Sequence, residues 1–151
     1  MKKLKFLAIL FVATLLLTGC GGSKDKTTKC VLKLDDPGSF EVTTTYTIHH
    51  KDNLVTKIIL DELIISNDND VLDYFEEYVN QMYPLYNDTY GGYTYETKRG
   101  SDRLTSKVTM DFTKMDLVKF SQNTGVKTNS NNKVEIDEMV STYKGYGATC
   151  D

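Results

Sequence analysis

The clearest reactive groups in this 151-residue chain are three cysteines, Cys20, Cys30 and Cys150. Cys20 follows a basic and then apolar leader, whereas the other two stand near opposite ends of the rest of the chain. A cysteine thiolate can act as a nucleophile, as a metal ligand or as a disulfide partner. The different settings predict one chemistry for Cys20 and another for Cys30 and Cys150.

The leader is typical of an export signal. Lys2, Lys3 and Lys5 precede an apolar run over residues 6–17, interrupted by Thr14. About 12 residues are too few to span a ~30 Å hydrocarbon core but suit the apolar part of a signal peptide. The run Leu17-Thr18-Gly19-Cys20 then resembles the lipobox of bacterial lipoproteins, where a diacylglyceryl group is transferred to the cysteine sulfur and the chain is cleaved before it.

This resemblance divides the chain into three parts. We expect residues 1–19 to be a lipoprotein signal peptide and residues 20–29 to be a lipidated Cys20 with a flexible tether. We expect residues 30–151 to form one globular domain. Fatty acyl chains such as palmitate would hold it at the extracytoplasmic face of a cell membrane. The alternatives are an ordinary secretory signal with a chance cysteine, or an uncleaved N-terminal helix.

Cys30 and Cys150 are an even pair, which predicts a disulfide bond if the domain is exported. The bond would close a loop of about 120 residues and constrain the unfolded chain. Two free buried thiols, a metal site or redox chemistry are the alternatives. No CxxC occurs in the sequence, and the chain has only two histidines, so zinc and thioredoxin-like chemistry are disfavoured.

Other polar clusters give no catalytic or metal site. His49 and His50 are adjacent, so on a strand they point to opposite faces, and we expect a solvated pair at a turn. The neighbouring acids Asp61-Glu62 and Glu76-Glu77 also point apart, which favours solvated or salt-bridged faces. Residues 67–70, Asn-Asp-Asn-Asp, fit a helix cap better than a calcium loop. We therefore expect no catalytic residue, metal or cofactor.

Tyrosines surround the connection between a predicted helix and a predicted hairpin. They are Tyr83, Tyr86, Tyr90, Tyr93 and Tyr95. Their apolar rings and polar tips suit an exposed surface for a glycan or peptide, and we assign Tyr86, Tyr90 and Tyr93 as candidate binding residues. The alternative is that alternate tyrosines fill the core.

Charge excludes one class of partner. The chain has 18 basic and 21 acidic residues, and removing the three leader lysines leaves 15 basic residues, a balance of −6. A nucleic-acid binder needs a basic face, so we expect no nucleic-acid partner. A polybasic membrane contact is excluded in the same way, which leaves the covalent lipid as the membrane link.

Hydrophobic periodicity predicts an α+β fold. Residues 30–34 suit a short first strand, and residues 40–49 alternate strictly, with Phe40, Val42, Thr44, Tyr46 and Ile48 facing inward. Residues 54–65 are apolar on both faces, which predicts a central strand covered, at least in part, on both sides. A helix with a core face follows and should end near Tyr83, before Pro84. A polar, tyrosine-containing connection over residues 85–92 should follow it, with Gly91 and Gly92 as its flexible end.

The second half predicts a hairpin and two short helices. Tyr93 and Tyr95 begin the hairpin, and the return strand turns Leu104, Val108 and Phe112 inward. A capping box that begins at Thr113 predicts a helix to about Ser121, burying Leu117, Val118 and Phe120. A polar loop over residues 123–132 leads to a last helix that ends at Gly145. We expect an antiparallel sheet of about four to five strands with these helices packed on it.

With this layout, the chain resembles the YehR-like bacterial lipoproteins, a family of unknown function. The likeness rests on the lipobox, the strand-helix-strand layout, the run from Leu104 to Leu117 and the closing Gly145-Tyr-Gly-Ala-Thr-Cys150. It implies a small α+β fold and supplies no catalytic residues to carry over.

The sequence thus favours a non-enzymatic, lipid-anchored surface protein that binds an envelope protein or a small ligand. The competing hypotheses are an envelope hydrolase with an unrecognised site and a purely structural envelope component.

Overall fold

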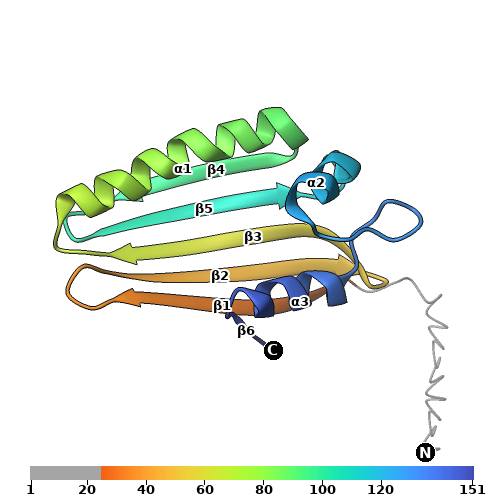
Figure 1. Ribbon diagram of the computed structural model, residues 1–151, viewed down its shortest axis with the longest axis horizontal. Coiled ribbons are helices and arrows are strands. Elements are labelled where there is room, and N and C mark those ends of the chain that lie inside the picture. Colours follow the sequence, from red (N-terminus) through yellow and green to blue (C-terminus); the bar gives the residue numbers. More distant parts are fainter. Residues whose placement is uncertain (1–24) are drawn as a thin grey trace, which may run out of the picture.

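The computed structural model describes residues 25–151, which form one antiparallel sheet with helices on one of its faces (Figure 1). The predicted signal peptide and Cys20 lie outside the described residues. The α+β class, the long helix after the third strand and the short C-terminal helices are confirmed. Among the described residues, none of the helices has the length and apolar character needed to cross a membrane.

The sheet has six strands in the order β4-β5-β3-β2-β1-β6, and all neighbouring strands are antiparallel. The strands are β1 (Lys26–Asp36), β2 (Phe40–Lys51), β3 (Leu54–Ile65), β4 (Tyr93–Arg99), β5 (Arg103–Asp111) and β6 (Thr149–Cys150). Tight turns join β1 to β2 and β2 to β3, and Asp52 and Asn53 adopt positive φ at the second turn, as short-side-chain turn residues can.

Strand β1 begins four residues earlier than expected. Residues 26–29, which the sequence predicts as tether, pair with residues 47–50 of β2. The long alternating strand β2 supplies backbone partners along this whole length, so polar side chains do not prevent the pairing. The two-residue strand β6, which the sequence did not predict, pairs with β1 opposite Cys30 and Val31.

Helices α1 (Asn69–Tyr90), α2 (Leu117–Thr124) and α3 (Ile136–Gly145) lie on the same side of the sheet. Helix α1 packs along β4 and β5, and α3 packs against β1 and β6 (Figure 1). The expectation that β3 is covered on both faces is therefore wrong. Its second set of apolar residues, including Ile59 and Leu63, lies half-buried on the bare face among threonines and charged side chains.

Helix α1 continues through Pro84 for seven residues beyond its predicted end near Tyr83. An interior proline loses one backbone hydrogen bond and costs about 3 kcal/mol. Burial offsets this cost, because Tyr83 is buried and both Tyr86 and Tyr90 pack against the core. Residues 85–90 are therefore helix and not the polar connection that was predicted, and Gly91 caps the helix at positive φ.

Two further local predictions are corrected at α2. The N-cap is Asp116, whose carboxylate accepts a hydrogen bond from the backbone N–H of Lys119 at 3.0 Å, and not Thr113. Asp111 holds Thr113 instead, through both the hydroxyl and the N–H of Thr113. The helix starts at Leu117, and this turns Val118 outward while Leu117 and Phe120 stay buried. The last helix agrees with its prediction and ends at Gly145.

Gly92 links α1 to β4 in a place where a side chain has no room. Its φ is +75°, and a Cβ would lie 2.6 Å from the Asp111 carbonyl oxygen and 2.7 Å from Met115 Cγ. Gly125 has nearly the same φ, +77°, but a Cβ there would meet nothing within 4 Å. The two glycines thus separate backbone strain from steric overlap.

We predict that Gly125→Ala lowers the free energy of unfolding by about 1 kcal/mol, the cost of left-handed backbone for alanine. Gly92→Ala should lose at least about 2 kcal/mol more, because the Asp111 backbone must also shift. Urea denaturation followed by circular dichroism measures both. Equal losses in the two variants would contradict the close contact at Gly92.

Candidate functional site

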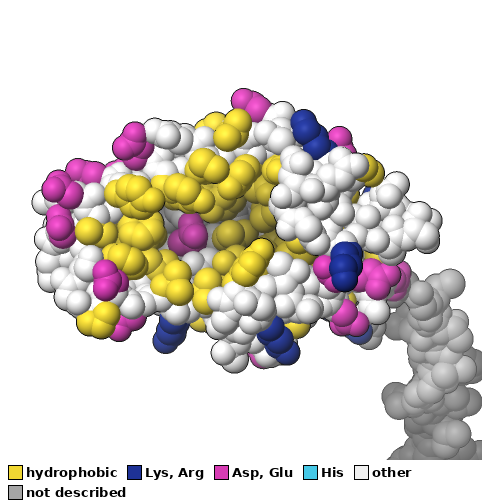
Figure 2. All heavy atoms as spheres, in the orientation of Figure 1, with side chains coloured by type: hydrophobic (Ala, Val, Ile, Leu, Met, Phe, Trp, Pro, Cys, Tyr) yellow, Lys and Arg dark blue, Asp and Glu magenta, His cyan; other side chains and the backbone are white. Residues whose placement is uncertain are grey.

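The helix-covered face of the sheet has a hollow of about 630 Å³ between α1, α2 and α3. Figure 2 shows it as a depression with hydrophobic walls, and acidic atoms are visible at its floor. Leu60 of β3 and Met110 of β5 lie among the lining residues. The hollow exists because α1 covers one half of the sheet and α3 the opposite edge, while no helix covers the middle.

Eight tyrosines line this hollow. One group comes from α1 and β4 and the other from β2, α3 and the residue after α3. The full set is Tyr46, Tyr78, Tyr83, Tyr86, Tyr90, Tyr93, Tyr143 and Tyr146. The candidate residues Tyr86, Tyr90 and Tyr93 thus lie together, with ring centroids 5.7–6.5 Å apart.

The candidate tyrosines differ in exposure. Tyr93 is buried, whereas Tyr86 and Tyr90 are half-buried and pack against the main core cluster. Burial raises the pKa of Tyr86 and Tyr93 above the usual range, in each case with a smaller contribution from neighbouring tyrosines. The site is therefore the wall of a recess and not the exposed aromatic surface that the sequence suggested.

Sequence reasoning missed the opposite wall. Tyr46 of β2 stacks on Tyr143 of α3 with ring centroids 3.9 Å apart and an angle of 22° between the planes. Burial, followed by the nearby Glu62, raises the pKa of Tyr46 to about 12. These residues are far apart in the sequence, and only the placement of α3 over the sheet joins them.

A row of polar side chains crosses the same face of the sheet. Strand pairing aligns Thr97 with Ser106, Ser106 with Glu62, and Glu62 with Thr44. Thr44 and Ser106 are only 4% exposed. This polar row, defined as Thr97, Ser106, Glu62 and Thr44, separates two hydrophobic clusters, the larger around Phe112 and the smaller around Leu72.

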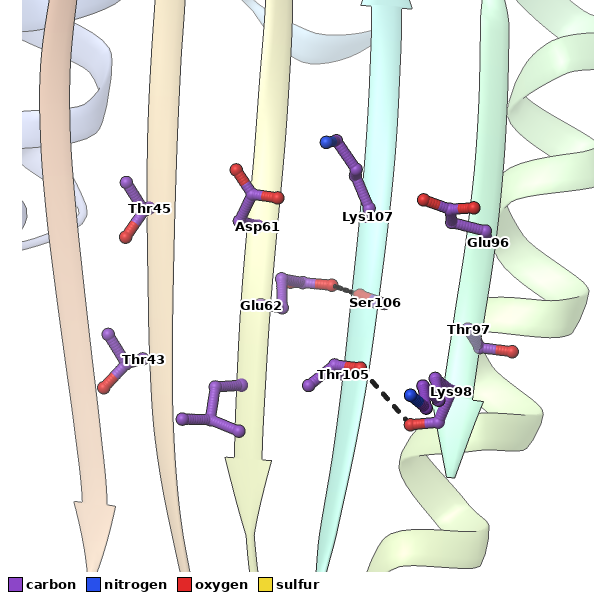
Figure 3. A pocket seen from close by; sticks show the side chains of 11 residues that line it. Thr43, Thr45, Asp61, Glu62, Glu96, Thr97, Lys98, Thr105, Ser106 and Lys107 are labelled. Atoms are coloured by element: carbon purple, nitrogen blue, oxygen red, sulfur yellow. Dashed lines mark hydrogen bonds between the residues drawn. The ribbon is translucent and has the colours of Figure 1, made fainter. Parts of the chain in front are cut away.

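Glu62 is the acidic member of the polar row. The Ser106 hydroxyl donates a hydrogen bond to its carboxyl group (Figure 3). Burial raises the pKa of Glu62, and the hydrogen bond from Ser106 opposes that shift. The expectation of a solvated or salt-bridged face is wrong here, because none of the described ion pairs includes Glu62.

A pattern in the sequence does locate Glu62. It falls in phase with Ile58, Leu60 and Ile64, the inward set of β3, whereas its neighbour Asp61 points to the bare face and is exposed. An acid in an inward phase breaks the binary pattern of the strand. A buried acid at such a position lowers the stability of the fold, and residues of this kind are common at functional sites.

A second depression of about 720 Å³ spans β2, β3, β5 and β4. Most of its lining residues lie on the bare face, and Glu62, Thr97 and Ser106 of the polar row also border it. Figure 3 shows Asp61, Lys107 and Glu96 in line across it, flanked by threonines such as Thr43 and Thr45. A ligand on this open surface would remain exposed to water on one side. Such a surface does not enclose a small molecule.

The remaining polar candidates of the sequence do not form a site. His50 is buried on β2 beside a β-bulge, with its Nε2 3.3 Å from the Thr28 hydroxyl, so it is not the solvated residue expected at a turn. Asp68 caps α1, as predicted for residues 67–70. Across residues 25–151, no group of three or more His, Cys, Asp or Glu residues is arranged to hold a metal ion.

Cys30 and Cys150 lie directly opposite each other on β1 and β6, with their sulfur atoms at disulfide distance. The backbone bond from Asp151 N–H to the Lys29 carbonyl holds the adjacent residues together. The Cys30–Cys150 pair ties the C-terminus, just beyond α3 and Tyr146, to the sheet that forms the floor of the hollow.

Fold and site together define a class: a one-sided antiparallel α+β domain with a tyrosine-lined hollow on its helical face. Two solved structures are similar to it. An NMR structure of a protein from Streptococcus pneumoniae TIGR4 has a TM-score of 0.55 and 21% identity, covering 100% of this chain and 98% of that one.

The NMR structure of the E. coli YehR protein has a TM-score of 0.56 and 16% identity, covering 85% of this chain and 92% of that one. At these identities the likeness shows a shared fold, which supports the YehR-like architecture. No protein-family model matches the chain, and no curated protein matches it.

We predict that Glu62→Gln stabilises the protein at pH 8 and not at pH 4. Because folding raises the pKa of Glu62, ionisation opposes folding. The stability from this group is complete below the unfolded pKa of about 4.3 and is lost as the pH rises through the folded pKa. Glutamine mimics the neutral acid at every pH.

Thermal unfolding at pH 4 and pH 8 measures this difference, and Asp61→Asn on the bare face is the matched control. The Glu62→Gln variant should gain melting temperature over the parent at pH 8 only, and Asp61→Asn should show no such gain. A stability loss in Glu62→Gln at both pH values would contradict the buried, neutral-favouring environment of Glu62.

Proposed function

We propose that the chain is a lipid-anchored, non-enzymatic binding protein of a bacterial cell envelope, and that the tyrosine-lined hollow is its ligand site. The observation that carries the binding role is the hollow itself. Its volume of about 630 Å³ lies within the range of small-molecule sites. Aromatic walls with a few polar groups are the usual lining of such sites.

The chemistry of the lining favours binding over hydrolysis. The described residues around the hollow supply tyrosine hydroxyls, Asn123, Thr124 and Thr142 as polar groups, but no histidine, cysteine or serine. Glu62 at the edge accepts a hydrogen bond from Ser106 and has no second carboxylate beside it in the polar row. Hydrolytic sites combine a nucleophile with a base, or two convergent acids.

The envelope location rests on the sequence of the leader. The run Leu17-Thr18-Gly19-Cys20 follows a basic start and a short apolar segment. A lipid on Cys20 would anchor the domain, because two or three acyl chains bury enough methylene groups for stable attachment. The opposed Cys30 and Cys150 suit an oxidising compartment outside the cytoplasm.

The lipid anchor predicts that cells given radiolabelled palmitate incorporate the label into the full-length protein, because Cys20 is the acylated residue. Cys20→Ala should lose the label and release the protein from the membrane fraction, whereas Ser23→Ala, a nearby control, should keep both. Gel fluorography of the two variants measures this. Label that survives in Cys20→Ala would refute the anchor.

The binding role predicts that protein extracted from its own membranes carries a ligand that native mass spectrometry detects. Tyr86→Ala combined with Tyr90→Ala should lower the occupied fraction at least about tenfold, because each lost ring removes wall contacts. Both side chains are half-buried and pack against the core, so the double variant should lose stability, and thermal unfolding must show that it is folded at the temperature of the measurement.

Tyr74→Ala is the matched control, since Tyr74 is on α1 but 66% exposed and outside the hollow. It should leave the occupied fraction unchanged. Equal ligand occupancy in the parent and the double variant would show that the ligand does not bind in the hollow.

A further inference from the structure

The two tyrosine walls border a space lined largely by aromatic rings. On one side, Tyr83, Tyr86, Tyr90 and Tyr93 contact one another with centroid separations of 5.7–6.5 Å. On the other side, Tyr46 stacks on Tyr143, and Tyr146 packs edge-on against Tyr143 at 6.5 Å. Both walls line the same hollow.

The charge around this space has one sign. No lysine, arginine or histidine is among the described residues that line the hollow. Glu62 lies two residues along β3 from Leu60, and its strand partner Thr44 lies two residues along β2 from Tyr46. Leu60 and Tyr46 both line the hollow, so Glu62 is next to its floor. After burial, Glu62 is the next cause of the raised pKa of Tyr46 and of Tyr83.

This combination is selective for cations. An ammonium group placed over a tyrosine ring is attracted by the negative π face, and the attraction grows when water is excluded. A carboxylate nearby adds a direct charge pair. An anionic ligand would meet the same faces and the same carboxylate with repulsion and would find no basic partner among the lining residues.

The ligand should also be partly apolar and small. Leu60, Met110, Phe120 and Met139 lie among the lining residues, so alkyl groups on the cation would find apolar contacts. Residues 25–151 hold all 21 acidic residues of the chain against 14 basic ones, which disfavours approach to an anionic lipid surface. A small organic cation free in solution would make these apolar contacts without requiring the acidic domain to approach a lipid surface.

We propose that the hollow binds a small alkylammonium ligand, with its cationic group enclosed by tyrosines of the two walls and oriented by the Glu62 carboxylate. This inference rests on the proposed function, because it names the ligand class of the same site. Ser106 is then a positioning residue, because its hydroxyl donates a hydrogen bond that orients the Glu62 carboxylate.

Choline and its uncharged analogue, in which carbon replaces the quaternary nitrogen, test the proposal because the two probes share one shape. Calorimetric titration of the mature protein, residues 20–151, measures both affinities. The chain has no tryptophan, so its intrinsic fluorescence reports the tyrosines directly. Choline should bind at least about tenfold more tightly than the analogue and should change the tyrosine emission.

Glu62→Gln should remove most of the preference for choline while leaving the affinity for the uncharged analogue unchanged. Asp61→Asn, which removes an acid from the bare face at the adjacent position, should keep the full preference. Because both variants lose one negative charge, the comparison separates a local charge pair from the overall acidity of the domain.

Equal affinities for the two probes would overturn the cation proposal and leave the hollow as a binding site. Failure of both probes to bind would also overturn it, and the ligand detected on the membrane-extracted protein then decides the proposed function separately. A choline preference that Glu62→Gln and Asp61→Asn reduce equally would overturn the role of Glu62.

Discussion

The structure depends on one constraint: a six-stranded sheet whose helices lie on one face only and do not cover all of it. Helix α1 lies along β4 and β5, and α3 lies against β1 and β6. None of the described helices shields the middle of the sheet, where β3 and β2 pair, so side chains must shield its apolar residues from water. Large side chains from both helices do this, and most of them are tyrosines. The hollow is therefore a product of incomplete cover, and its aromatic lining is what allows the core to remain stable around it.

The polar row weakens the hydrophobic core between the sheet and the helices. A hydrophobic layer interrupted by Thr44, Glu62 and Ser106 is less cohesive than one filled with leucine, because buried polar groups must find partners. The row divides the apolar residues into a larger cluster near the hollow and a smaller one under the start of α1. Natural proteins keep such groups where function needs them. That reasoning gives Glu62 its place in the proposed site.

Much of the fold was predictable from periodicity. The inward set of β2, the limits of β3 and the end of α3 follow from local alternation and a terminal glycine. Helix α1 was predicted too short because the packing of Tyr86 and Tyr90, which outweighs the cost of Pro84, is a tertiary effect. One wall of the hollow was predicted as a candidate site because its tyrosines are close in sequence. The other wall was not, because Tyr46 and Tyr143 meet only after the chain folds. Glu62 was readable from its phase on β3, but neighbouring Asp61 made the pair look like an exposed acidic patch.

The pairing of β1 with β6 also has a topological consequence. With Cys30 and Cys150 joined, every element from β2 to α3 belongs to one covalent ring, and the segment before Cys30 joins that ring at a single point. A protease that cuts any one loop, including the polar loop after α2, opens the ring without dividing it. Both fragments stay linked through the Cys30–Cys150 bond, and the two walls of the hollow stay in one molecule. Under the proposed lipid anchor at the cell surface, a single nick would leave the domain attached and its hollow complete.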